Sequence, residues 1–181
     1  MSTLLNENRF DMAKLFYGIG VEVGVADGTY ANAILGTNPN VVKLYGVDPY
    51  APYRGYTDYT RGTTFNKMHA HAEERLAQFG DRHEFIFKLS MDAVKDFEDS
   101  FLDFVYIDAN HSYATCLEDI SAWTPKVKKG GFVCGDDYTR SVKPGNQVIQ
   151  AVNDYVKWHD IPELMVYGEG RNPTNWMFIK P

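Results

Sequence analysis

The sequence predicts an α/β fold with one doubly wound, mostly parallel sheet. Short runs of β-branched and aromatic residues alternate along the 181-residue chain with longer amphipathic stretches, which is typical of successive strand–helix units. The last two runs are separated only by GEGRNPT, a short segment that predicts a hairpin and hence one antiparallel strand at the end. The expected sheet is Rossmann-like and seven-stranded.

The strands are expected in residues 18–24, 41–48, 83–89, 101–108, 130–136, 163–168 and 175–180. The helices are expected in residues 8–17, 28–36, 61–79, 91–98, 112–123 and 145–159. The length suits one domain, so a single domain is predicted over residues 1–181, with a short N-terminal helical segment in residues 1–17. In residues 49–65 four tyrosines alternate with Pro, Gly and Arg, and we expect this long loop to be a lid that binds substrate.

Composition excludes several classes of partner. The formal net charge of −6 argues against nucleic acid, whose binders normally present a basic face. No apolar run approaches the roughly 20 residues of a membrane span, and the N-terminus lacks the layout of a signal peptide. Cys116 and Cys134 lie in apolar surroundings, so reduced core thiols are expected, as suits a cytoplasmic protein. Homo-oligomerisation is left open.

The segment VEVGVADGTY predicts a strand, a glycine-containing turn and the start of a helix. Gly24 and Gly28 would let the backbone turn tightly and approach a ligand, and the helix N-terminus favours an anion. A dinucleotide fingerprint needs a further glycine where Ala26 stands, so a pyrophosphate is less expected here than a nucleotide ligand that bears a carboxylate. A plain strand-to-helix turn is the alternative.

Two further strand ends carry residues suited to a nucleoside. Asp48 ends the second expected strand, where an acidic side chain can accept hydrogen bonds from both ribose hydroxyls. Its alternative role is to cap the following turn. After the third expected strand, Leu89 and Met91 could flank a purine ring while Ser90 or Asp92 reaches its edge. Ser90 could instead be the N-cap of the next helix.

Three carboxylates are expected at the same edge of the sheet. The fourth strand ends in Asp108 and the fifth in Asp136 and Asp137. In a partly desolvated cleft, such groups either take up protons or hold a hard divalent cation, with Mg²⁺ as the default expectation. The cation would lower the pKa of a substrate hydroxyl. His111 could then accept the proton, with its own pKa lowered by the cation; pinning the loop is its alternative role.

The order EVGVADG, GVD, FKLSMDA, YIDANHSY and KKGGFVCGDDY resembles class I S-adenosylmethionine-dependent methyltransferases. The resemblance covers residues 18–180 and is strongest to the small group related to macrolide sugar O-methyltransferases, and more distant to catechol O-methyltransferase. It implies metal-assisted O-methylation of a hydroxyl on a small molecule of the sugar or natural-product type. About 17 residues precede the first expected strand, fewer than in the caps that many relatives fold over the acceptor.

The resemblance also implies roles for individual residues. Asp48 would bind the ribose, the segment from Gly24 to Gly28 would hold the methionine portion, and His111 would be the base. The implied catalytic residues are His111 and Asp108, and the implied metal ligands are Asp108, Asp136 and Asp137. The candidate cofactor-binding residues are Glu22, Gly24, Gly28, Tyr30, Asp48, Pro49, Ser90, Met91, Asp92 and Asp108.

Other functions stay open from the sequence. One is a metal-independent methyltransferase of the same fold, in which Asp136 and Asp137 serve as turn and capping groups. Another is a dinucleotide-dependent oxidoreductase, against which the missing glycine argues. A third is a catalytically idle nucleotide-binding module.

Overall fold

The computed structural model describes residues 2–5, 7–56, 62–139, 146–168 and 174–181, and contains one sheet in the order β1-β7-β8-β6-β5-β2-β3-β4. Its strands are β1 (Ser2–Leu5), β2 (Gly18–Val23), β3 (Val41–Val47), β4 (His83–Ile86), β5 (Leu102–Ile107), β6 (Val127–Gly135), β7 (Leu164–Tyr167) and β8 (Asn175–Ile179). Strand β8 pairs antiparallel with β6 and β7, and the other neighbours are parallel. The predicted fold class is therefore confirmed.

The sheet has eight strands where seven were predicted. The additional strand is β1, which pairs in parallel with β7 at the edge of the sheet. At four residues it is too short to show a strand period, and a short edge strand has a neighbour on one side only. The helix expected over residues 8–17 is also shorter, because α1 spans Arg9–Ala13.

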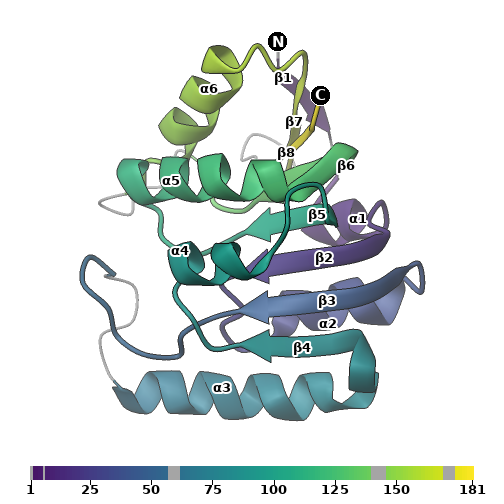
Figure 1. Cartoon of the computed structure of the whole chain (residues 1–181), viewed down its shortest axis with the longest axis vertical. Helices are drawn as coiled ribbons and strands as arrows, with labels where there is room; N and C mark the ends of the chain where they lie inside the picture. Colours follow the sequence, from purple (N-terminus) through teal and green to yellow (C-terminus); the bar gives the residue numbers. More distant parts are fainter. Residues whose placement is uncertain (1, 6, 57–61, 140–145, 169–173) are drawn as a thin grey trace.

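Helices cover both faces of the sheet (Figure 1). They are α1, α2 (Thr29–Thr37), α3 (Gly62–Leu76), α4 (Ser90–Ala93), α5 (Tyr113–Trp123) and α6 (Val148–Trp158), with 3₁₀ turns η1 (Ala77–Arg82), η2 (Val94–Asp96) and η3 (Thr124–Lys126). Helices α1, α2 and α3 contribute to one buried apolar cluster, and α4, α5 and α6 contribute to the other. Within the described ranges, no helix combines the length and the apolar character needed to cross a bilayer.

Strand β5 lies between β2 and β6, and all six of its residues are buried. Phe104 and Tyr106 pack in the cluster of α1–α3, whereas Val105 and Ile107 pack in the cluster of α4–α6. A strand buried on both faces needs an unbroken apolar run, which explains why this strand was predictable. Its carboxyl end carries Asp108 to the edge of the sheet.

The ends of β2 and β5 approach each other closely at this edge. The backbone N–H of Asp108 donates to the carbonyl of Val23 at 2.8 Å. Gly24 follows at φ +95°, and a Cβ atom there would overlap the carbonyl oxygen of Asp108. The glycine is therefore required by backbone packing between two strands as well as by its left-handed conformation.

Gly24→Ala should destabilise the protein by about 2 kcal/mol or more, because the methyl group meets backbone that cannot rotate away and the residue sits in a strained conformation. Gly36→Ala is the matched control: it lies within α2, and the nearest atom to its new Cβ would be Phe79 Cζ at 3.7 Å. That change should be neutral or stabilising by up to about 1 kcal/mol. Urea unfolding of both variants measures the difference, and equal stabilities would contradict the packing argument.

Candidate functional site

A cavity of about 230 Å³ opens at the carboxyl edge of the sheet. The ends of four adjacent strands contribute to its walls: Val23 and Gly24 at the end of β2, Val47 and Asp48 at the end of β3, residues 88–91 after β4, and residues 108–110 after β5. The strand order reverses here, because β2 lies between β3 and β5. Ligands of open α/β sheets bind at such a switch point.

The segment after β3 covers part of this cavity. Tyr50, Tyr53, Arg54 and Tyr56 line it, and the rings of Tyr53 and Tyr56 stack at 4.9 Å. Asn110 Nδ2 donates to the carbonyl of Gly55 at 3.1 Å, which joins the segment to the loop after β5. The first half of the predicted lid thus lines the pocket, and its role in binding substrate stays a prediction. Residues 57–61 lie outside the described residues, and helix α3 begins at Gly62, inside the predicted loop.

Asp48 ties two loops together beneath the cavity. Its Oδ2 accepts the backbone N–H groups of Val25 at 3.1 Å and Ala26 at 3.0 Å, and its Oδ1 accepts that of Tyr50 at 2.8 Å. Burial raises the pKa of Asp48, although these three donors favour its charged form. The turn-capping role left open from the sequence is therefore present, together with a position in the wall of the pocket.

Only part of the segment after β4 faces the pocket. Leu89, Ser90 and Met91 line it, whereas Asp92 is exposed and bonds Lys95 at 2.8 Å. Of Ser90 and Asp92, either of which could have reached the edge of a purine, only Ser90 therefore lines the pocket. The N-cap of α4 is Leu89, without a side-chain cap, so the alternative role of Ser90 as N-cap is wrong.

Ser90 instead belongs to a hydrogen-bonded chain with α5. Its hydroxyl bonds Asp119 Oδ1, and Trp123 Nε1 donates to Ser90 Oγ at 2.9 Å. Asp119 also lines the pocket and was not singled out from the sequence. The sequence did contain a signal for Asp119, because its helical spacing puts this carboxylate on the inner face of α5 with Cys116, Ile120 and Trp123.

Three other residues predicted to bind the cofactor do not line the pocket. Glu22 is 1% exposed, and its Oε2 has no hydrogen-bond partner among the described residues. Burial, and then the charge of Asp108, raise the pKa of Glu22 well above its ordinary value, which favours its neutral form. Gly28 is the N-cap of α2, and the hydroxyl of Tyr30 donates to the carbonyl of Arg9 at 2.9 Å. Pro49, by contrast, lines the pocket as predicted.

Next to the pocket, Asp108, His111 and Asp137 converge. One ligand atom from each lies within 4.8 Å of the other two. His111 Nε2 is 2.8 Å from Asp137 Oδ2 and 3.6 Å from Asp108 Oδ1. Burial alone would lower the pKa of His111, but the two carboxylates outweigh burial and raise it to about 10. The lowered pKa expected from the sequence presupposed a bound cation, whereas the two carboxylates by themselves favour the charged imidazolium.

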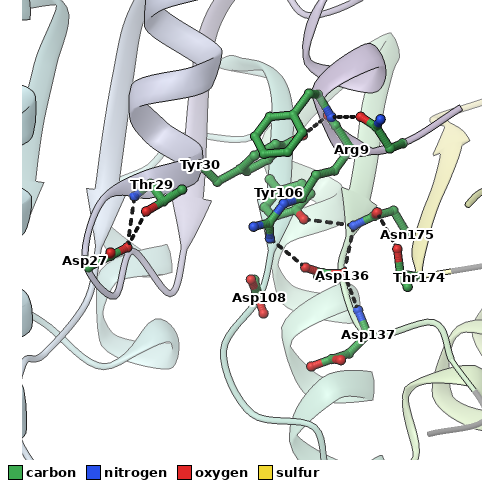
Figure 2. A network of polar contacts seen from close by, with 12 residues as sticks. Arg9, Asp27, Thr29, Tyr30, Tyr106, Asp108, Asp136, Asp137, Thr174 and Asn175 are labelled. Carbon is green, nitrogen blue, oxygen red and sulfur yellow. Dashed lines mark hydrogen bonds and ion pairs between the residues drawn. The ribbon is translucent and has the colours of Figure 1, made fainter.

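Asp136 points elsewhere (Figure 2). Its Oδ2 accepts from Arg9 Nη1 at 2.9 Å, and its Oδ1 accepts from Asn175 Nδ2 and the backbone N–H of Asp137, both at 2.8 Å. Burial, and then the charge of Asp108, raise the pKa of Asp136 to about 6. His111 therefore takes the place that was predicted for Asp136 in the group of converging side chains. No local sequence pattern indicated that Arg9, which lies near the start of the chain, pairs with Asp136.

Comparison with known proteins identifies the family of this chain. A family model described as a methyltransferase domain matches residues 21–138, more than half of the chain. The chain belongs to this family of methyltransferases. Its members use S-adenosylmethionine, so the pocket at the switch point has a cofactor to fit.

The individual relatives are distant. A protein of Acanthamoeba polyphaga mimivirus, named Uncharacterized protein R132, is 26% identical over 149 residues, which cover 82% of this chain and 62% of that protein. The chain thus spans less than two thirds of the length of this relative. An rRNA methylase from Streptococcus thermophilus has a TM-score of 0.65 at 17% identity, covering 95% of this chain and 93% of that one. An O-methyltransferase family protein from Burkholderia thailandensis has the same TM-score and identity, covering 95% and 55%. These two structures share the fold.

Asp48→Ala should weaken binding of S-adenosylhomocysteine by about 1.5–3 kcal/mol, the scale for hydrogen bonds to a charged group. Asp27→Ala is the matched control. Asp27 also holds the loop before α2, through Thr29 and Arg75, but does not line the pocket. Calorimetric titration of both folded variants separates ligand contact from loop support, and equal losses of affinity would contradict a ribose contact by Asp48.

Proposed function

We propose that the protein transfers the methyl group of S-adenosylmethionine to a hydroxyl of a small molecule. The supporting observation is the double position of Asp108, which lines the pocket and also belongs to the group with His111 and Asp137. An acceptor oxygen held at that group would lie beside the end of the pocket at which β2 and β5 meet. The methyl donor and the acceptor would then share one wall.

In this reaction the methyl group passes directly from sulfur to the acceptor oxygen, without a covalent bond to the protein. The acceptor oxygen attacks the methyl carbon, the carbon–sulfur bond breaks with its electron pair going to sulfur, and the hydroxyl proton passes to a base. Holding the two reactants in line can supply on the order of 7–11 kcal/mol of barrier reduction at best. The walls formed by the strand ends and by Tyr50, Tyr53 and Tyr56 would provide this alignment and exclude water.

The donor set fits a divalent cation. Asp108 and Asp137 offer carboxylate oxygens, and His111 Nε2 stands close enough either to be a third ligand or to accept the proton of a bound acceptor. When bound, the cation would lower the pKa of the acceptor hydroxyl. Mg²⁺ and Mn²⁺ prefer oxygen ligands, whereas imidazole suits Fe²⁺ or Zn²⁺. If His111 is a ligand, Fe²⁺ or Zn²⁺ is a better candidate than the Mg²⁺ expected from the sequence, whereas Mg²⁺ or Mn²⁺ fits a site in which His111 acts as the base.

Metal-independent transfer by the same fold is the second candidate, and a specific observation favours it. The carboxylate of Asp136 caps the backbone N–H of Asp137 and pairs with Arg9, as expected of a structural residue. Family membership, in contrast, removes the support for an oxidoreductase.

The composition favours a small acceptor. A net charge of −6 suits neither rRNA nor another polyanion, because phosphate backbones are bound through basic faces. Tyrosines in the described part of the lid offer flat faces on which a sugar or an aromatic ring can stack. We therefore expect a sugar or natural-product hydroxyl as the acceptor.

Incubation with S-adenosylmethionine and a panel of glycosides, catechols and polyketide alcohols should release S-adenosylhomocysteine with at least one hydroxyl acceptor. Pretreatment with EDTA should lower this turnover by at least about 10-fold, and added Mn²⁺ or Mg²⁺ should restore it, because the cation stabilises the developing alkoxide. Mass spectrometry of the product identifies the methylated oxygen. A panel without any methylated hydroxyl would contradict O-methylation.

Matched variants assign the cation to its residues within the same assay. Asp137→Asn should lose the restoration by metal, whereas Asp160→Asn, on an exposed residue, should keep it. Full, EDTA-resistant turnover in Asp137→Asn would favour the metal-independent mechanism.

His111→Ala should slow methyl transfer by roughly 10²–10⁴-fold, the usual contribution of a general base. Affinity for S-adenosylhomocysteine should change little, because His111 does not line the cofactor pocket. His71→Ala, on the exposed side of α3, is the control and should retain full turnover. Parallel losses of stability and cofactor affinity in His111→Ala would instead assign His111 to support of the loop.

A further inference from the structure

A chain of three side chains closes one end of the pocket. Asp119 and Trp123 come from the inner face of α5 and are 5% and 0% exposed. Between them stands Ser90, the first residue of α4, whose hydroxyl bonds Asp119 Oδ1 and accepts from Trp123 Nε1 at 2.9 Å. Ser90 and Asp119 both line the pocket, so the chain joins the core to the ligand space.

The chemistry of the three groups fixes the direction of each hydrogen bond. An indole N–H can only donate, so it occupies one lone pair of the Ser90 oxygen. An ionised carboxylate can only accept, so the Ser90 proton must point to Asp119. Burial raises the pKa of Asp119 to about 6, against the hydrogen bond from Ser90 that lowers it, which leaves this group ionised near neutral pH. One lone pair of Ser90 remains, and it can accept a hydrogen bond from a ligand.

The sheet order places Ser90 where, in the proposed cofactor site, the base of a nucleoside would lie. Strands β5, β2, β3 and β4 are consecutive neighbours, and their ends line the pocket in that order. Gly24 and Asp108 form one side, Asp48 lies next, and Ser90 lies beyond it. With a ribose at Asp48, the base extends toward Ser90 and the sulfur toward Asp108.

We propose that Asp119 is a positioning residue that holds the Ser90 hydroxyl as a hydrogen-bond acceptor, so that the pocket selects a purine with an exocyclic amine over a 6-oxo purine. The inference rests on the proposed S-adenosylmethionine site. Glu118, an exposed carboxylate, lines the same end and adds a second group that only accepts. A 6-oxo group would face acceptors without a donor, and a polar group left unpaired on binding costs affinity.

The test compares S-adenosylhomocysteine with S-inosylhomocysteine, which carries oxygen in place of the amine, by calorimetric titration. The unaltered protein should bind the adenosyl ligand about 10- to 100-fold more tightly, as one unsatisfied hydrogen bond predicts. In Asp119→Asn the amide can donate to Ser90, which frees the hydroxyl proton to point into the pocket. The preference should therefore fall by about 10-fold in this variant. Asp99→Asn, a remote exposed aspartate paired with Lys126, should keep it.

Ser90→Ala provides a second route where Asp119→Asn does not fold, because it removes the hydroxyl and leaves the pocket shape unchanged. Its preference should also fall toward one. A general loss of packing would weaken both ligands alike, so the ratio of the two affinities distinguishes positioning from structural support. An unchanged ratio in either folded variant, or a ratio near one in the unaltered protein, would overturn the inference. If the unaltered protein binds neither ligand, the proposed cofactor site itself is wrong, and the inference falls with it.

Discussion

The site depends on the neutralisation of carboxylates that one edge of the sheet draws together. Charges in a partly buried cleft are costly unless each is paired, hydrogen-bonded or protonated. Asp48 is held by three backbone N–H groups, Asp136 by Arg9, and Asp137 by His111. For Glu22, whose Oε2 has no hydrogen-bond partner in the described part of the chain, burial favours the neutral form. The charge of each acid is thus stabilised or removed in a different way, and this determines which of the acids are available for chemistry.

Under the proposed function, these different partners separate a cofactor side from an acceptor side. Asp48 faces the pocket with its charge already supported by backbone, which leaves a rigid group for a ribose. Asp108 and Asp137 are balanced by His111, a side chain whose proton can be exchanged for a cation or for the proton of an acceptor. Arg9, which does not lose its charge in proteins, fixes Asp136 in a structural role. His111, whose proton can be exchanged, thus lies where the chemistry is expected, whereas Arg9, whose charge is permanent, supports the structure beside it.

The sequence predicted the strands well, because runs buried on both faces, such as β5, have a composition that few other elements share. It missed β1, whose four edge residues carry no period. Within the site, residues that follow strand ends were predictable from topology, and Gly24, Asp48, Met91 and Asp108 lie where expected. Two features were not predictable in this way. Ser90, which lines the pocket where Asp92 does not, is bonded to Asp119. Asp136 is paired with Arg9, and His111 lies in the group with Asp108 and Asp137. Arg9 lies 127 residues from its partner, a distance at which sequence spacing carries no information.

The wide separation of Arg9 and Asp136 also bears on how the molecule assembles. Among the described residues, those that line the pocket fall between Val23 and Asp119. The support of Asp136, in contrast, joins α1 near the start of the chain to Asn175 in the last strand. Contacts between residues so far apart in the chain form late in folding, because their formation costs the most chain entropy. A chain emerging during synthesis would therefore complete the pocket before Asp136 is held from both sides, which waits until the final strand has entered the sheet.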